Sequence, residues 1–144
     1  GDPPNGTATT DRTTKTGQRN QMTSGRVTIN GHTYQHNSGG NGNGNLPPGQ
    51  YTVTAFKNTT SQAGMVRDGV GFSYKITQPG HADGATDRRT GTERSLLRIH
   101  PDGGNAGTLG CMGIVGNAAT LRQFREDMNA ELRRNGGRFT LNVQ

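Results

Sequence analysis

Cys111 and His100 are the two residues whose types and spacing could perform covalent chemistry. Cys111 is the single cysteine of the chain, and His100 precedes it at the end of a short apolar run. A free thiol is only slightly ionised at neutral pH, so a nucleophilic cysteine needs a basic or cationic neighbour. The glycine-rich stretch 101–110 would let the chain turn and bring the two side chains together. The pair therefore indicates a cysteine nucleophile with a histidine base.

The residue types alone leave a structural interpretation open. A lone cysteine followed by Met112 is also typical of a small buried hydrophobic side chain, and a strand-end histidine often bonds only a local group. In the catalytic interpretation, the backbone N–H groups of Gly110, Cys111 and Met112 could stabilise an oxyanion. The other three histidines form no cysteine–histidine pair with zinc spacing, so we expect no metal and no cofactor.

Short apolar runs predict a mainly β fold. Six of them are expected to form strands, at 26–30, 32–36, 50–56, 69–77, 95–100 and 138–143. Asn30-Gly31 is the pattern of a tight hairpin turn. One helix is expected over 117–135, with Asn117 as its N-cap, an apolar stripe at spacings of three and four, and Gly136 at its end. We therefore predict a curved or barrel-like sheet with one helix packed on it before the final strand.

The chain divides into two segments that differ in composition. Residues 1–25 are rich in Thr, Gly, Pro and Asn, with Met22 as the single large apolar residue, and are expected to form a flexible N-terminal arm or linker. Residues 26–144 hold the other large apolar side chains and are expected to form one catalytic domain. Within that domain, the polar segment 78–94 is long enough to be a lid or binding loop.

The chain is basic, with a formal net charge of +6. Such a charge attracts polyanions, which include nucleic acids, anionic lipids and the acidic polymers of a bacterial envelope. The arginines are scattered, and the helix at 117–135 mixes basic with acidic side chains, so we expect no nucleic-acid binding. No apolar run approaches the length of a membrane span, so we also expect no membrane insertion.

The stretch RIHPDGGNAGTLGCMGIV at 98–115 resembles the catalytic motif of the L,D-transpeptidase (YkuD-type) family. That motif contains a histidine, a glycine-containing stretch, Ser/Thr-x-Gly-Cys and then an apolar residue. Upstream, LPPGQYTV at 46–53 is similar to the family's Pro-x-Gly-x-Tyr/Phe turn and strand. Downstream, a helix and a terminal strand follow the cysteine, as in the family. The resemblance spans 26–143 and is closest to the compact branch with antibacterial L,D-transpeptidase-like effectors.

The resemblance implies a catalytic role for five residues. Cys111 would attack a peptide carbonyl in the tetrapeptide stem of peptidoglycan, at the bond between an L-centre and a D-centre next to diaminopimelate. His100 would take the thiol proton and later hand it to the leaving amine, with the backbone carbonyl of Pro101 as its partner. Thr108 occupies the Ser/Thr position of the motif and would shape the oxyanion pocket with the backbone of Gly110.

One position departs from the family pattern. Many members carry an arginine two residues after the cysteine, where it can meet a substrate carboxylate, whereas this chain has Gly113. Other arginines could take that role, and the candidates are Arg98, Arg88, Arg89 and Arg67. The residues that we assign to substrate binding are Arg98, Leu109, Met112, His81 and Tyr74.

With the resemblance, the sequence predicts a cysteine-dependent enzyme that trims peptidoglycan stem peptides, as an L,D-carboxypeptidase or endopeptidase, or that exchanges their D-amino acids. The alternatives are a cross-linking L,D-transpeptidase and a non-catalytic cell-wall-binding module on the same fold. We expect a monomer acting in the bacterial periplasm or cell wall. Because the chain starts at Gly1 without a signal peptide, we expect processing, or delivery by a secretion system or phage. An immunity protein or a delivery apparatus would then be its protein partner.

Overall fold

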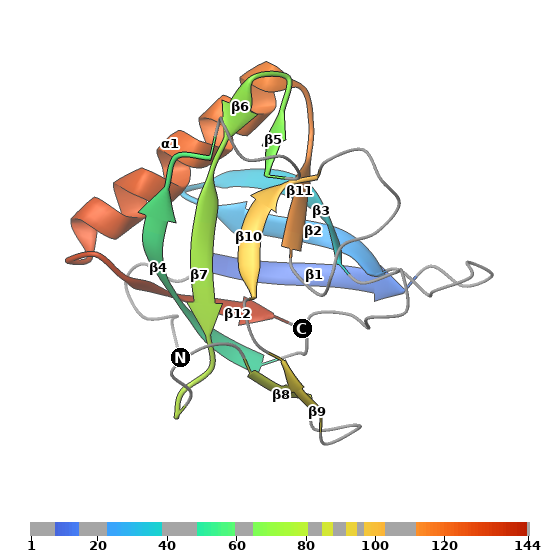
Figure 1. Ribbon diagram of the computed structural model, residues 1–144, viewed down its shortest axis with the longest axis vertical. Coiled ribbons are helices and arrows are strands. Elements are labelled where there is room, and N and C mark those ends of the chain that lie inside the picture. Colours follow the sequence, from blue (N-terminus) through green and yellow to red (C-terminus); the bar gives the residue numbers. More distant parts are fainter. Residues whose placement is uncertain are drawn as a thin grey trace.

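The computed structural model describes residues 8–14, 23–38, 49–59, 65–80, 85–87, 92–94, 97–102 and 112–143, which form a curled sheet, two small hairpins and a helix (Figure 1). The main sheet contains β1 (Ala8–Thr14), β2 (Thr23–Ile29), β3 (His32–Ser38), β4 (Gly49–Lys57), β7 (Ser73–Thr77), β10 (Arg98–Pro101), β11 (Met112–Val115) and β12 (Phe139–Val143). The hairpins are β5 (Val66–Arg67) with β6 (Val70–Gly71), and β8 (Ala85–Asp87) with β9 (Thr92–Arg94). The helix is α1 (Ala118–Arg134).

The main sheet closes on itself because β1 pairs on both of its sides. The strand order is β1-β12-β4-β7-β10-β11-β3-β2, with β1 parallel to β12 and antiparallel to β2. The strands β10 and β11 are also parallel to each other, and they stand on either side of the segment 103–111 in the sequence. The expected mainly β fold, a curved or barrel-like sheet with one helix before the final strand, is confirmed.

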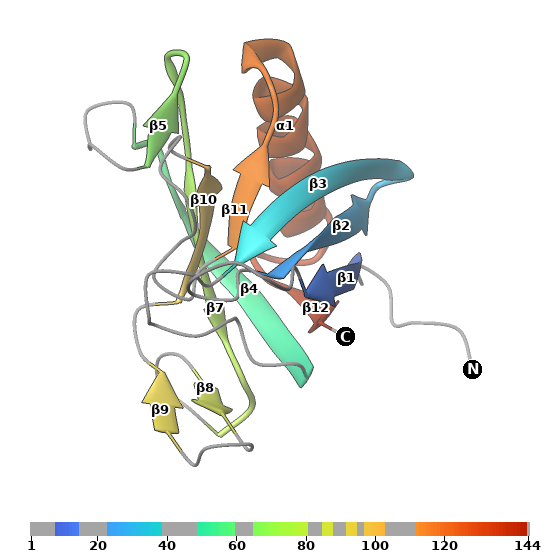
Figure 2. The same cartoon turned by 90° about the vertical axis from the view of Figure 1, so that its right-hand side faces the viewer.

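The two hairpins and the helix mark the two ends of the sheet. The β5–β6 hairpin and the start of α1 lie at one end, where β11 leads into the helix, and the β8–β9 hairpin projects from the other end (Figure 1 and Figure 2). The segment 78–94 was expected to be a lid or binding loop. It contains the short antiparallel pair β8 and β9.

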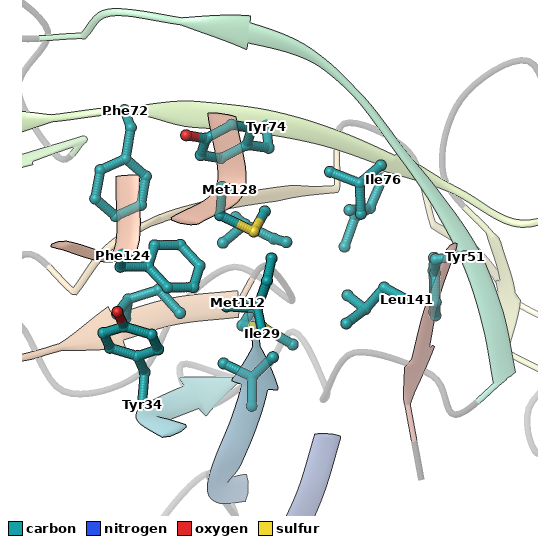
Figure 3. Close-up of a cluster of buried hydrophobic side chains, with 14 of the residues drawn as sticks. Ile29, Tyr34, Tyr51, Phe72, Tyr74, Ile76, Met112, Phe124, Met128 and Leu141 are labelled. Atoms are coloured by element: carbon teal, nitrogen blue, oxygen red, sulfur yellow. The ribbon is translucent and has the colours of Figure 1, made fainter. Parts of the chain in front are cut away.

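The core forms between the inner face of the sheet and the apolar stripe of α1. Alternation along the strands, and through Phe72 between β6 and β7, places the apolar side chains inward, as the sequence predicts. Each of these is at most 4% exposed: Val27, Ile29, Tyr51, Val53, Val70, Phe72, Tyr74, Ile76, Phe139, Leu141 and Val143. Four helix residues meet them: Leu121, Phe124, Met128 and Leu132. The Phe124 ring lies 5.1 Å from that of Tyr34 and 5.3 Å from that of Phe72, measured between centroids (Figure 3). The expected helix, its stripe and its Asn117 cap are confirmed, since the Asn117 side chain accepts from the Thr120 N–H at 2.9 Å.

The structure differs from two expectations about strands. Residues 1–25 were expected to be a flexible arm, but 8–14 form β1 and β2 already begins at Thr23. The physical reason is that the threonine-rich run ATTDRTT has β-branched residues that favour an extended backbone. The alternation over 50–56 also predicts that Ala55 shares the buried face of Tyr51. Instead the register shifts between Thr54 and Lys57, and Ala55, at φ 54°, is exposed.

A buried carboxylate joins the β2–β3 hairpin to the helix. The turn is the expected Asn30-Gly31, with φ of 51° and 79° at the two residues. Asp127 of α1 is 6% exposed. Its Oδ1 accepts from the Asn30 side-chain amide at 3.1 Å, and its Oδ2 lies 2.9 Å from Nδ1 of His32 and also accepts from the Tyr34 hydroxyl. Burial and the neighbouring carboxylate raise the pKa of Tyr34, so its hydroxyl stays a donor.

Replacing Asp127 by alanine should therefore lower the free energy of unfolding by about 2–3 kcal/mol, because the substitution leaves the buried Tyr34 hydroxyl without its acceptor and removes the contacts to Asn30 and His32. Urea denaturation would measure this change. The matched control is Glu126→Ala, which removes an exposed carboxylate from the neighbouring helix position and should change the free energy by less than about 0.5 kcal/mol. Equal losses for the two variants would show that Asp127 does not hold the hairpin.

Candidate functional site

The candidate site is built around His100 near the end of β10. In this strand Ile99 and Pro101 are buried, whereas Arg98 and His100 lie on the other, partly exposed face. The alternation in the sequence predicts that the Arg98 side chain lies on the opposite face of the strand from Ile99, and this is confirmed. The face of the sheet that carries His100 is thus the one that does not contribute to the apolar core.

A backbone carbonyl fixes the state of the His100 ring. Nδ1 of His100 lies 2.8 Å from the carbonyl oxygen of Pro101. Because a carbonyl oxygen can only accept, Nδ1 carries a proton, and in the neutral ring the lone pair is then on Nε2. The resemblance implied this partner for the histidine, and the contact forms between adjacent residues. The arrangement makes His100 suited to accept a proton at Nε2.

Burial also sets the charge of His100. The pKa of the imidazole is lowered from its ordinary value, chiefly because burial disfavours the charged ring. The hydrogen bond to the Pro101 carbonyl and the negative charge of Asp102 act in the opposite direction. His100 is therefore neutral at neutral pH, which is the protonation state that a general base requires.

The parallel pairing of β10 with β11 determines what surrounds His100. Ile99 stands opposite Met112, and His100 stands opposite Gly113. On the other side of β11, Gly113 stands opposite Asn37 of β3. Gly113, the departure from the family pattern, thus occupies the ladder position between His100 and Asn37, where it contributes no side chain to the face that carries His100.

Hydrogen bonds from three directions hold the residue that follows β10. The backbone N–H of Asp102 donates to the Ile114 carbonyl at 2.8 Å, and the Asn37 amide donates to Oδ2 of Asp102 at 2.9 Å. Nη1 of Arg67, in the β5–β6 hairpin, donates to the Asp102 carbonyl at 3.4 Å. Asp102 is therefore fixed beside His100, where its charge acts on the imidazole.

A cavity of about 290 Å³ lies next to Asp102, where β10 and β11 end and α1 begins. The lining combines the turn of the β5–β6 hairpin with the segment that leads into the helix, and it consists of Arg67, Asp68, Asp102, Val115, Gly116 and Asn117. The tip of this hairpin is a tight turn, with φ of 51° at Asp68 and 79° at Gly69.

Two of the residues assigned to substrate binding have no accessible surface. Met112 is fully buried at the start of β11. Tyr74 is fully buried too, and its hydroxyl donates to the Asn129 side-chain oxygen at 2.9 Å and to the Arg125 carbonyl at 3.2 Å. Both side chains pack in the core between the sheet and the helix. Arg98 lies on the His100 face, with Nη1 donating to the Leu97 carbonyl at 2.8 Å.

The remaining assigned residues lie outside the described part of the chain. They are Cys111, Thr108, Gly110, Leu109 and His81, together with Arg88 and Arg89. The proline turn at 46–48 is outside it as well.

Sequence reasoning missed the contribution of Asn37, Asp102 and the β5–β6 hairpin. Asn37 and Asp102 are 65 positions apart, so their contact has no local signal. The hairpin did have one, because Asp68-Gly69 between two valine-containing runs is a strong pattern for a tight turn. That pattern could have placed Arg67 directly before the turn of a hairpin.

Comparisons with known protein families, curated proteins and solved structures gave no match to this chain. In the part that the structure describes, no helix combines the length and apolar character needed to cross a membrane. Among the same residues, no three His, Cys, Asp or Glu side chains come together in a way that could hold a metal ion.

The His100 imidazole should titrate below 6.5, the ordinary value of a histidine pKa, because burial outweighs the two opposing effects. The neutral form then persists to lower pH than in an ordinary histidine. Nitrogen-15 NMR on Cys111→Ala, where no thiolate couples to the ring, would measure both the midpoint and the tautomer. We expect a proton on Nδ1 and none on Nε2 at neutral pH. A midpoint above 6.5, or the opposite tautomer, would contradict this assignment.

Proposed function

We propose that this protein is a cysteine enzyme that cleaves or exchanges peptide bonds in peptidoglycan stem peptides, with Cys111 as the nucleophile and His100 as the base. The observation that carries the proposal is the 2.8 Å contact between Nδ1 of His100 and the Pro101 carbonyl, which leaves Nε2 as the proton acceptor. The substrate class comes from the resemblance of the His100–Cys111 stretch to the L,D-transpeptidase motif.

The pairing of β10 with β11 supports the two proposed partners. Met112, the first residue of β11, stands opposite Ile99 of β10, the strand that carries His100. Cys111 directly precedes Met112 in the sequence. Consecutive Cα atoms are about 3.8 Å apart, which keeps Cys111 near the start of β11. The proposal puts the sulfur within reach of Nε2, on the face where Gly113 adds no side chain.

The proposed reaction begins when Nε2 of His100 takes the proton from the Cys111 thiol. The thiolate forms a bond to the carbonyl carbon of the stem peptide, and backbone N–H groups at Gly110 and Cys111 stabilise the oxyanion. The carbon–nitrogen bond then breaks, and the leaving amine takes the proton from the imidazolium. The product is a thioester between Cys111 and the shortened stem.

The second half of the reaction releases the acyl group. When water attacks, His100 removes its proton, the thioester bond breaks, and the carboxylic acid and free thiol are formed. When a D-amino acid or another stem supplies the amine, the same step gives exchange or a cross-link. We propose trimming or exchange as the main outcome, and the ratio of products depends on which nucleophile reaches the thioester.

Purified muropeptides with tetrapeptide stems, incubated with the protein and analysed by mass spectrometry, test the proposal. We expect loss of the terminal D-alanine or its exchange for an added D-amino acid, and a protein mass increase that corresponds to the thioester. Cys111→Ala should abolish turnover, and His100→Ala should lower kcat/KM by about 10²–10⁴-fold. Unchanged muropeptides, with wild type and Cys111→Ala indistinguishable, would sink the proposal. Dimeric muropeptides would identify the cross-linking alternative.

The reactivity of the thiol separates an enzyme from a wall-binding module. In the enzyme, the rate of iodoacetamide labelling of Cys111 should follow a pKa well below the ordinary thiol value of about 8.5, because the thiol proton moves to His100 and the imidazolium formed stabilises the thiolate. The His100→Ala variant should return the midpoint toward that value. An inert thiol in the folded protein, labelled only after unfolding, would favour the binding module.

A further inference from the structure

Acidic and basic residues are distributed unevenly over the main sheet. Of its described strands only β1 contains an acidic residue, Asp11, and that residue stands opposite Arg26 of β2. On the other side of the barrel, Lys75 of β7 stands opposite Arg98 of β10. Both side chains belong to the outer face of the sheet, the face that carries His100 and not the apolar core. Like charges directly opposite each other on antiparallel strands are unfavourable, so this pairing concentrates positive charge where the strands supply no anion.

A β-bulge adds a third cation to the outer face. Along a regular ladder Phe56 would stand opposite Ser73 of β7. The register instead shifts within β4, where Ala55 has a φ of 54°, and Lys57 takes the position opposite Ser73. The Phe56 ring packs on Tyr74, whose side chain is in the core, with 5.3 Å between the two centroids. The bulge therefore replaces an aromatic ring with an ammonium group on the outer face.

The three cations are accessible and spread over a distance that a single small anion does not span. Lys57 is exposed, and Lys75 and Arg98 are partly exposed. Neither lysine forms a salt bridge with a carboxylate of the described residues. Adjacent strands are about 4.8 Å apart, and Lys57 is displaced from the row of Lys75 and Arg98 by two ladder positions, roughly 7 Å. A linear polyanion can contact all three cations at once.

The side chains on this face favour a phosphate chain without bases. Two of the three cations are lysines, whose ammonium groups bind phosphate as point charges and lack the fork that matches a planar carboxylate. The outward positions of β4, β7 and β10 carry no Phe, Tyr or Trp on which nucleic-acid bases could stack. They do carry the hydroxyl groups of Thr52 and Thr54, which can bond phosphate oxygens and the hydroxyls of a polyol.

We propose that the outer face of β4, β7 and β10, which lie side by side in Figure 1, binds a phosphodiester-linked polyol chain through Lys57, Lys75 and Arg98. The inference goes beyond the proposed function, because it concerns a second polymer and needs neither the Cys111 thiol nor turnover. His100 is the next outward residue of β10 after Arg98, so the bound chain runs beside the candidate site. Binding would hold the protein at a surface that carries such chains.

Fluorescence anisotropy of a labelled poly(glycerol phosphate) chain, titrated with the protein, tests the inference. The logarithm of the binding constant should fall with the logarithm of salt concentration with a slope of about −2, as expected for three phosphate contacts on a flexible strand. The double variant Lys57→Gln, Lys75→Gln should reduce the slope to about −0.7 and weaken binding at low salt by about tenfold or more. Poly-L-glutamate and single-stranded oligothymidine of equal charge should bind about fivefold more weakly, since one offers carboxylates and the bases of the other find no aromatic partner.

The matched control is the double variant Arg122→Gln, Arg133→Gln, which removes two positive charges from exposed positions of α1. It should keep the wild-type slope and affinity, so an equal loss there would show that net charge and not this face sets binding. The lysine variant should keep at least the wild-type urea midpoint, because it relieves the repulsion with Arg98 and leaves the core intact. Equal affinity for the three polymers, a slope that survives the lysine substitutions, or no binding of poly(glycerol phosphate) would overturn the inference.

Discussion

The contact between the apolar stripe of α1 and the inner face of the curled sheet is the interaction on which the rest of the structure depends. Only 26% of the residues are hydrophobic, so the chain can fill one compact core and little more. Strict alternation in the strands sends the apolar side chains to that core. The same alternation leaves every second position of β10 for polar side chains. His100 and Arg98 occupy those positions because Ile99 and Pro101 are needed inside.

The parallel alignment of β10 and β11 places the candidate site at these two strands. A parallel pair needs a crossover between its strands, and here the crossover is the segment that carries the Thr-x-Gly-Cys motif. The His100 ring is oriented by the carbonyl of the next residue, so the orientation needs no third side chain from a distant strand. Pro101 has no N–H to donate, but it keeps the carbonyl that this contact uses.

Most of the fold could be predicted from the sequence, since the periodic signals were strong. The helix with its Asn117 cap, the Asn30-Gly31 turn and the inward faces of the strands follow from local patterns. The strand β1 was missed because threonine-rich runs favour strands only when partners such as β12 and β2 are present. The burial of Tyr74 also follows from a local pattern, because it shares one face of the run 69–77 with Phe72 and Ile76 and packs with them in the core.

The candidate site was less predictable because its environment is assembled from distant segments. The His100–Pro101 contact is local and was expected, but Asp102 acquires its partners from β3 and from the β5–β6 hairpin. Those partners matter for the chemistry. Burial alone would make His100 a poor proton acceptor, and the Asp102 charge and the Pro101 carbonyl partly restore its basicity. Hydrogen bonds from the Asn37 amide and the Arg67 guanidinium hold Asp102 in place. The strength of the base at His100 is thus set by a balance between burial and a carboxylate that the rest of the fold must keep at the end of β10.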